Sequence, residues 1–148
     1  MRILMICLGN ICRSPMAEYV LRHLVREAGL EREIVVDSAA TSRYQIGCTP
    51  HHGTRRVLAE HGIPCGKHRA RQLTRRDYDC YDLIIGMDEE NRWDILNILG
   101  DDPAGKVHSL LDWSARPRPI ADPWYTGDFE TTYADVLEGC ETLLRHVS

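Results

Sequence analysis

Cys7 and Arg13 lie six positions apart near the start of the chain, and Ser14 follows directly. A cysteine thiolate can attack a phosphoryl group, and an arginine guanidinium can bind two phosphate oxygens at once. A hydroxyl near the cysteine could donate a hydrogen bond to the sulfur when it leaves. These three residue types could carry out covalent phosphoryl chemistry if the chain between them forms a loop.

The segment between them has the features of an anion-binding loop. Gly9 permits a tight turn, and Asn10 tolerates a left-handed backbone. Backbone N–H groups at the start of a helix can surround an anion, and the same position favours the thiolate form of a cysteine. We therefore predict a phosphate-binding loop that consists of Cys7, Leu8, Gly9, Asn10, Ile11, Cys12, Arg13 and Ser14.

The spacing alone is weak evidence, because Cys65 and Arg71 have the same spacing. That second pair has no strand before it and three bulky side chains inside it, so we interpret it as a coincidence. At Cys7 the setting is different. The apolar run 2–7 predicts a buried strand, and Ser14–Pro15 predicts a helix start with serine as the N-cap.

The rest of the chain predicts alternating strands and helices. Strands are expected at 2–7, 34–36, 81–87 and 106–110, and long helices at 14–28, 53–61, 88–99 and 129–146. Such alternation predicts an α/β fold, with a parallel sheet flanked by helices on both faces, in one domain over 1–148. Ligands bind beyond the carboxyl ends of such strands, so the Cys7 loop and Asp88 are expected to share one edge. We expect Asp88 to cap a helix or to brace the loop rather than to act as an acid.

A candidate general acid lies in the segment 111–128, which predicts no regular element. Asp122 precedes Pro123, and an acid that protonates the leaving group assists phosphate-ester cleavage. An aspartate before a proline is also a common turn residue. Composition alone does not separate the two interpretations.

These motifs resemble those of the low-molecular-weight protein tyrosine phosphatases, over nearly the whole chain. The resemblance rests on the blocks Cys7–Glu18, Asp37–Thr41, His61–Ile63, His68–Gln72, Met87–Asp88 and Asp122–Trp124. It implies that Cys7 is the nucleophile, Arg13 the phosphate binder and Asp122 the general acid. It also implies a four-stranded parallel sheet, and neither a metal nor an organic cofactor.

The resemblance bears on the substrate as well. A pocket above the loop with aromatic walls would suit a flat phosphorylated side chain, and its depth would exclude phosphoserine. The predicted wall residues are Tyr44, Trp124 and Tyr125, for which ordinary packing is the alternative. Some members of the family act on phosphoarginine and carry threonine where this chain has Ile11, so Ile11 favours phosphotyrosine. In the family the stretch after Gly47 usually carries an acidic residue and an arginine, whereas here 48–54 contains His51 and His52, which bears on preference at the rim.

Three alternatives remain open from the sequence. Protein arginine phosphatase is one, and arsenate reduction on the same fold is another, although it needs two further cysteines near the site. Cys80 precedes its strand rather than following it. The third alternative is a phosphopeptide-binding module without catalysis, which would not need Asp122. Cys12 could form a reversible disulfide with Cys7, or it could simply pack in the loop.

Composition limits the other classes of function. The chain has 148 residues and a net charge of −4, so no overall field favours nucleic acid. No signal peptide and no apolar stretch of membrane-spanning length are predicted. We expect a cytoplasmic protein, because reducing surroundings keep a thiol nucleophile usable. The expected partner is a phosphotyrosine protein, with a bacterial tyrosine kinase as one candidate.

Overall fold

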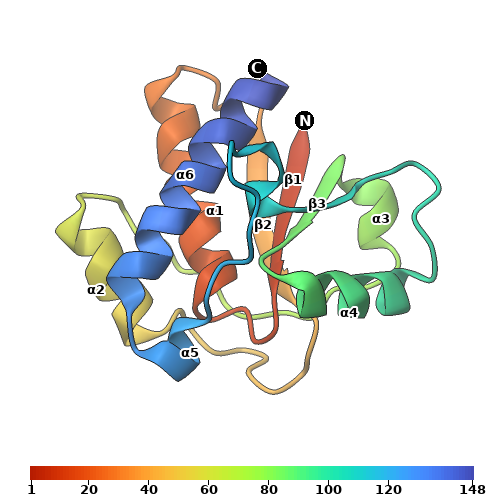
Figure 1. Ribbon diagram of the computed structural model, residues 1–148, viewed down its shortest axis with the longest axis horizontal. Coiled ribbons are helices and arrows are strands. Elements are labelled where there is room, and N and C mark those ends of the chain that lie inside the picture. Colours follow the sequence, from red (N-terminus) through yellow and green to blue (C-terminus); the bar gives the residue numbers. More distant parts are fainter.

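A parallel sheet of four strands forms the centre of the computed structural model, which describes residues 1–148 (Figure 1). The strands are β1 (Arg2–Cys7), β2 (Val35–Ala40), β3 (Leu83–Gly86) and β4 (Val107–Ser109). Their order across the sheet is β2-β1-β3-β4, and every neighbouring pair is parallel. Parallel neighbours need long crossover connections, and β1 lies inside the sheet with a partner on each side.

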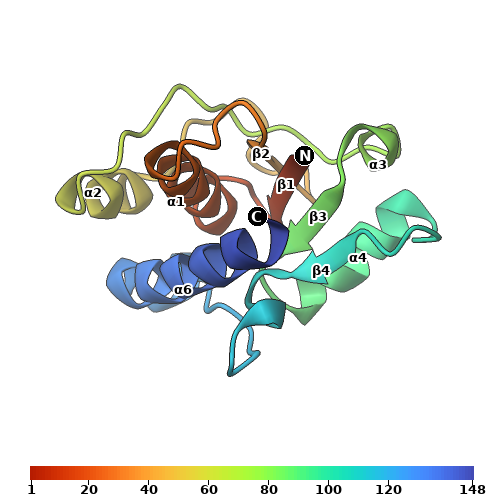
Figure 2. The same ribbon diagram turned by 90° about the horizontal axis from the view of Figure 1, so that it is seen from above.

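Helices cover both faces of the sheet. Figure 2 shows α1 and α6 lying side by side on one face, where α2 packs against both, whereas α4 covers the other face. No helix combines the length and the hydropathy of a membrane-spanning segment. The elements outside the sheet are α1 (Arg13–Glu27), α2 (His52–Glu60), α3 (Asp77–Cys80), α4 (Glu89–Leu99), η1 (Leu110–Trp113), α5 (Pro123–Thr126) and α6 (Phe129–Val147).

The alternation of side chains along β1 decides which way Cys7 faces. Ile3, Met5 and Cys7 belong to the core cluster under α1 and α6, while Leu4 and Ile6 belong to the smaller cluster under α4. Successive residues of a strand point to opposite faces, so this pattern follows from the pleat. Cys7 is the last residue of β1, and its side chain is therefore at the carboxyl edge on the α1 side.

The predicted elements are confirmed in type and order. All four strands and all four long helices are present, so the α/β class with a four-stranded parallel sheet and helices on both faces is confirmed. β2 continues beyond the apolar run 34–36 because it pairs with β1 as far as Ala40. The helices α3 and α5 and the 3-10 turn η1 were not predicted, since four residues are too few to show a helical repeat.

The predicted capping role of Ser14 is wrong. α1 begins one residue earlier, at Arg13, and its N-cap residue makes no side-chain capping bond. The Ser14 hydroxyl lies 3.0 Å from the sulfur of Cys7 instead. Pro15 still lies in the first turn, where a missing N–H removes no helical hydrogen bond.

Candidate active site

The loop between β1 and α1 turns its carbonyl groups away from its centre. Four carbonyl oxygens accept hydrogen bonds from donors outside the loop: Cys7 from Thr41 N (3.0 Å), Leu8 from Ser42 N (3.0 Å), Ile11 from His51 N (2.7 Å) and Cys12 from Thr54 Oγ1 (3.1 Å). The N–H groups of Gly9, Ile11 and Cys12 have no partner in the protein. Such amides can bind an anion above the Cys7 sulfur.

Asn10 closes the loop around Cys7. Its backbone has a φ of 58°, which asparagine tolerates better than most residues. Its N–H donates to Cys7 Sγ (3.2 Å), so this amide already points toward the sulfur. The Asn10 side chain donates from Nδ2 to Ser14 Oγ (2.7 Å). Since that bond uses Ser14 Oγ as an acceptor, the hydroxyl proton is left to donate to Cys7 Sγ.

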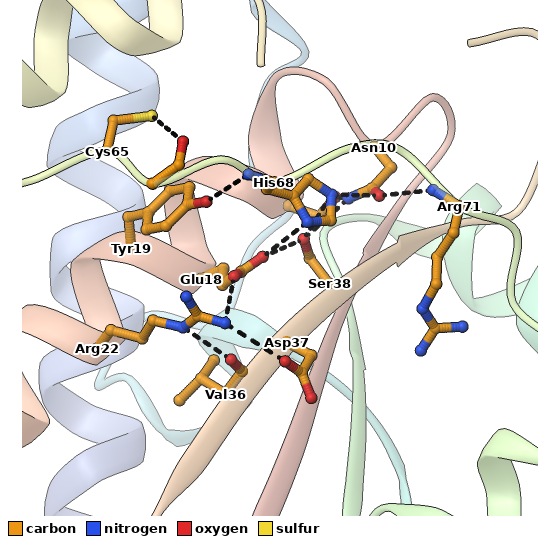
Figure 3. A network of polar contacts seen from close by, with 12 residues as sticks. Asn10, Glu18, Tyr19, Arg22, Val36, Asp37, Ser38, Cys65, His68 and Arg71 are labelled. Atoms are coloured by element: carbon orange, nitrogen blue, oxygen red, sulfur yellow. Dashed lines mark hydrogen bonds and ion pairs between the residues drawn. The ribbon is translucent and has the colours of Figure 1, made fainter. Parts of the chain in front are cut away.

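A buried polar network holds the other side of Asn10 (Figure 3). Asn10 Nδ2 also donates to Ser38 Oγ (2.9 Å), and Ser38 in turn donates to Glu18 Oε1 (2.5 Å). Asn10 Oδ1 accepts from His68 Nε2 (2.7 Å) and from Arg71 N (3.3 Å). Both Nδ2 protons and the Oδ1 atom are therefore engaged, and the amide has one possible orientation.

His68 donates to Asn10 through Nε2, and its Nδ1 lies 3.5 Å from Glu18 Oε1. A carbonyl oxygen only accepts, so His68 Nε2 carries the proton that binds Asn10 Oδ1. Burial, Arg22 and Arg71 lower the pKa of His68 to about 4, which keeps the ring neutral at physiological pH. Burial also raises the pKa of Glu18, which lies beneath Ser38. No sequence motif assigned a role to His68.

Arg13 is held by acceptors on several sides and keeps two N–H groups free. Nη1 donates to Asp88 Oδ2 (2.7 Å) and to the carbonyl of Ile120 (2.8 Å), and Nη2 donates to Asp122 Oδ2 (3.4 Å). These bonds use three of the five guanidinium protons. The Nε–H and one Nη2–H remain, and this pair of parallel donors matches two oxygens of a phosphate.

Arg13 stays charged although only 3% of its side chain is exposed. Burial opposes the charge, but Cys7 and Asp88 raise the pKa of Arg13. Asp88 also accepts from Asn91 N (2.7 Å) at the start of α4, so its predicted capping role is confirmed. Its bond to Arg13 of the loop agrees with the predicted bracing role, but Arg13 was not predicted as the partner, because nothing local in the sequence reports a pair 75 residues apart.

Asp122 is the N-cap residue of the short helix α5. Its Oδ1 accepts from Trp124 N (3.0 Å), so Asp122 is a turn and capping residue, as one of the two sequence interpretations expected. Its Oδ2 contacts Arg13, and the side chain keeps 21% of its surface exposed. The capping bond fixes the carboxyl group at the edge of the pocket that contains Cys7.

That pocket has a volume of about 260 Å³ and opens above the loop. The three predicted wall residues all line it, although they are largely exposed: Tyr44 (83%), Trp124 (55%) and Tyr125 (77%). Gln45 lines it as well and was not predicted. The full lining consists of Cys7, Leu8, Gly9, Ile11, Cys12, Tyr44, Gln45, Asp122, Trp124 and Tyr125.

Comparison with known proteins identifies the family. A profile of the family described as low molecular weight phosphotyrosine protein phosphatase matches residues 2–148. The chain belongs to this family. The low molecular weight protein-tyrosine-phosphatase YfkJ of Bacillus subtilis is 40% identical over 147 residues, which cover 98% of this chain and 94% of that protein. The human low molecular weight phosphotyrosine protein phosphatase is 40% identical, with coverages of 96% and 92%.

Solved structures of the family share the fold. The crystal structure of YfkJ superposes with a TM-score of 0.96, at 40% identity, and covers 99% of this chain and 94% of that chain. The crystal structure of a Drosophila arginine phosphatase superposes with a TM-score of 0.91, at 32% identity, with coverages of 100% and 98%. Proteins whose names indicate different substrates therefore share this fold, so individual residues around the pocket must decide the substrate.

The second Cys-to-Arg match does not form a comparable loop. Cys65 lies in a segment without helix or strand, and the Arg71 guanidinium donates to both carboxyl oxygens of Asp77 (3.0 and 3.1 Å). No strand precedes it and no long helix follows it. The features around Cys7, rather than the spacing, distinguish the two.

We predict that the neutral state of His68 makes stability depend on pH. Below the unfolded pKa of 6.5 the unfolded chain binds a proton that the folded ring, with a pKa of about 4, does not bind. Stability is therefore complete above pH 6.5 and falls as the pH drops toward 4, by up to about 3 kcal/mol from this group. His68→Gln keeps a donor to Asn10 and should not show the loss of stability that comes from protonation of His68.

Urea unfolding at several pH values from 4 to 7 measures the difference. The free energy of unfolding of the wild type should fall more steeply than that of His68→Gln. His52→Gln removes an exposed histidine and serves as the control. A difference between wild type and His68→Gln that stays constant over this pH range would contradict the prediction.

Proposed function

We propose that residues 1–148 form one phosphatase domain that hydrolyses phosphotyrosine in proteins through a cysteinyl-phosphate intermediate. Cys7 is the nucleophile, Arg13 binds the phosphoryl oxygens, and Asp122 is the general acid and base. The observation that carries this proposal is the arrangement around one sulfur. Unpartnered loop amides, the free donor pair of Arg13 and the Asp122 carboxyl group all belong to the site that contains Cys7 Sγ.

The choice of Cys7 over Cys12 rests on their surroundings. Cys7 Sγ has two neighbours that can donate, Asn10 N (3.2 Å) and Ser14 Oγ (3.0 Å), and such bonds favour a thiolate. Burial, Cys7 and Asp122 raise the pKa of Cys12 to about 12. A thiol with that pKa stays protonated near neutral pH and is a poor nucleophile.

In the first step, the Cys7 thiolate attacks phosphorus and the bond from phosphorus to the tyrosine oxygen breaks. Asp122 gives its proton to that oxygen, so tyrosine leaves as a neutral phenol. Charge on the transferring group is spread over its three other oxygens, which the loop amides and the free Nε–H and Nη2–H of Arg13 can bind.

In the second step, water attacks phosphorus and gives a proton to the Asp122 carboxylate. The sulfur–phosphorus bond breaks, and its electron pair returns to Cys7. The Ser14 hydroxyl, whose proton is available for the sulfur, stabilises the thiolate as it leaves. Phosphate is released, and Asp122 is again protonated for the next turnover.

The lining of the pocket favours an aromatic substrate. Seven of its ten residues are hydrophobic, and Ile11 presents an apolar side chain beside the loop. A phenyl ring can pack against these groups, whereas a guanidinium would lose water without gaining a polar partner there. The arginine phosphatase alternative is therefore not favoured, and arsenate reduction is not favoured because the pocket lining contains only one cysteine besides Cys7. Family membership and the position of Asp122 likewise disfavour a module that only binds.

Two finer statements belong to the same proposal. A tyrosine kinase that carries its own phosphotyrosines falls within the proposed substrate class. A cytoplasmic location suits the proposed chemistry, because all six cysteines are free and a catalytic thiolate needs reducing surroundings.

Replacement of the proposed catalytic residues should separate their roles. Cys7→Ser should lower kcat on phosphotyrosine peptides by roughly 10⁴-fold or more, because no covalent intermediate can form. Asp122→Asn keeps an acceptor for Trp124 N and should lower kcat by about 10²- to 10⁴-fold. Its loss should be smaller with p-nitrophenyl phosphate, whose leaving group needs less proton donation. Steady-state kinetics on both substrates measures these effects, and turnover that survives Cys7→Ser would contradict the mechanism.

A panel of matched peptides tests the substrate class. Peptides of one sequence that carry phosphotyrosine, phosphoserine or phosphoarginine should differ in kcat/KM, with phosphotyrosine preferred by at least about tenfold over each of the others. The reasons are the aromatic wall residues and the apolar contact at Ile11. Ile11→Thr should reduce the preference over phosphoarginine. A wild-type preference for phosphoarginine would overturn the argument from Ile11.

A further inference from the structure

Two exposed arginines without an acidic partner lie close to wall residues of the pocket, although they do not line it themselves. Arg43 and Arg69 are both exposed. The arginines that form ion pairs in this structure are Arg2, Arg13, Arg22, Arg56, Arg71 and Arg118. Arg43 and Arg69 are not among them, so their charges are uncompensated on a protein whose net charge is −4.

Neutral hydrogen-bond acceptors hold both side chains in place. Arg43 Nε donates to Gln72 Oε1 (3.0 Å), and Arg69 Nη1 donates to the carbonyl of Gly47 (3.0 Å). The two backbone segments are also joined, since Gly47 N donates to the carbonyl of Ala70 (2.8 Å). The guanidinium groups are thus partly ordered, and each keeps further N–H groups for a ligand.

These arginines adjoin the wall that Tyr44 and Gln45 contribute to the pocket. The segment from Arg43 to Gly47 contains Arg43 itself, both wall residues and the Gly47 carbonyl that accepts from Arg69. Another wall, to which Asp122, Trp124 and Tyr125 belong, carries no basic residue. Asp122 lines the pocket there, and Asp128 follows α5, where its hydrogen bonds with Thr131 lower its pKa and keep it anionic.

We propose that the substrates of this enzyme carry acidic residues next to the phosphotyrosine, and that Arg43 and Arg69 bind them. This inference rests on the proposed function, because it places the phosphotyrosine ring in the pocket above Cys7. Consecutive residues of an extended peptide lie about 3.3–3.6 Å apart, so the flanking side chains reach the rim when the ring is inserted. Acidic side chains at the rim are attracted by Arg43 and Arg69, whereas basic ones would face uncompensated positive charge.

The expected effect is moderate because the groups are exposed. An exposed ion pair changes affinity by about two- to fivefold, and two pairs together give roughly tenfold. Salt screens such contacts, with a Debye length of about 8 Å at physiological ionic strength. The preference should therefore be largest at low salt and should decrease as salt is added.

Three phosphotyrosine peptides that differ only in flanking residues test the proposal: one with aspartate, one with asparagine and one with lysine. The wild type should cleave the aspartate peptide with a kcat/KM roughly tenfold above that of the lysine peptide at low salt. In the double variant Arg43→Gln/Arg69→Gln this ratio should fall to about two or less. Because each ratio is measured within one variant, a general loss of activity cancels.

Arg32→Gln is the matched control. Arg32 is exposed and lies in the turn before β2, at the opposite end of that strand from the loop. This variant removes the same charge and should keep the wild-type ratio. A ratio near one in the wild type, or a ratio that the double variant leaves unchanged, would overturn the proposal.

The two proposals fail in different ways. If the wild type cleaves all three peptides equally, the phosphatase function stands and the docking proposal is wrong. If the wild type cleaves neither the peptides nor p-nitrophenyl phosphate, the proposed function fails, and the docking proposal fails with it.

Discussion

The site depends on one constraint, which is that the amides of a short loop must point inward and remain without protein partners. The loop meets it by satisfying its carbonyl groups outside, through donors from the segments after β2 and at the start of α2. Asn10 completes the turn with a positive φ and is fixed by bonds to Ser14, Ser38 and His68. Without these bonds nothing in the protein would hold the free amides in a position facing Cys7.

The second requirement is a buried guanidinium group that keeps its positive charge and its position in the site. Three acceptors hold Arg13, and the bonds to them leave a parallel pair of N–H groups unused. A buried charge without partners would cost several kcal/mol, so Asp88 and Asp122 make its position tolerable. Asp122 then contributes both to the placement of Arg13 and to the proposed proton transfers. One carboxyl group therefore has both a structural role and a proposed catalytic role.

The sequence predicted the fold and the loop well because both have local signals. Apolar runs marked the strands, and glycine, asparagine and Ser14–Pro15 marked the turn into α1. The loop residues that His68 and Asp88 contact were not predictable, because these contacts join segments 58 and 75 residues apart. Ser14 misled for a different reason. Its type fits a helix cap, but the turn of the loop itself places the Cys7 sulfur and the Asn10 amide beside its hydroxyl.

The most direct test of the account is identification of the phosphorylated residue during turnover. Asp122→Ala should accumulate the intermediate, because the second step lacks its base. Rapid acid quenching after mixing with p-nitrophenyl phosphate, followed by peptide mass spectrometry, locates the phosphoryl group. The account predicts one phosphoryl group on Cys7, which is absent in the Cys7→Ser/Asp122→Ala double variant. A phosphoryl group on another residue would contradict it.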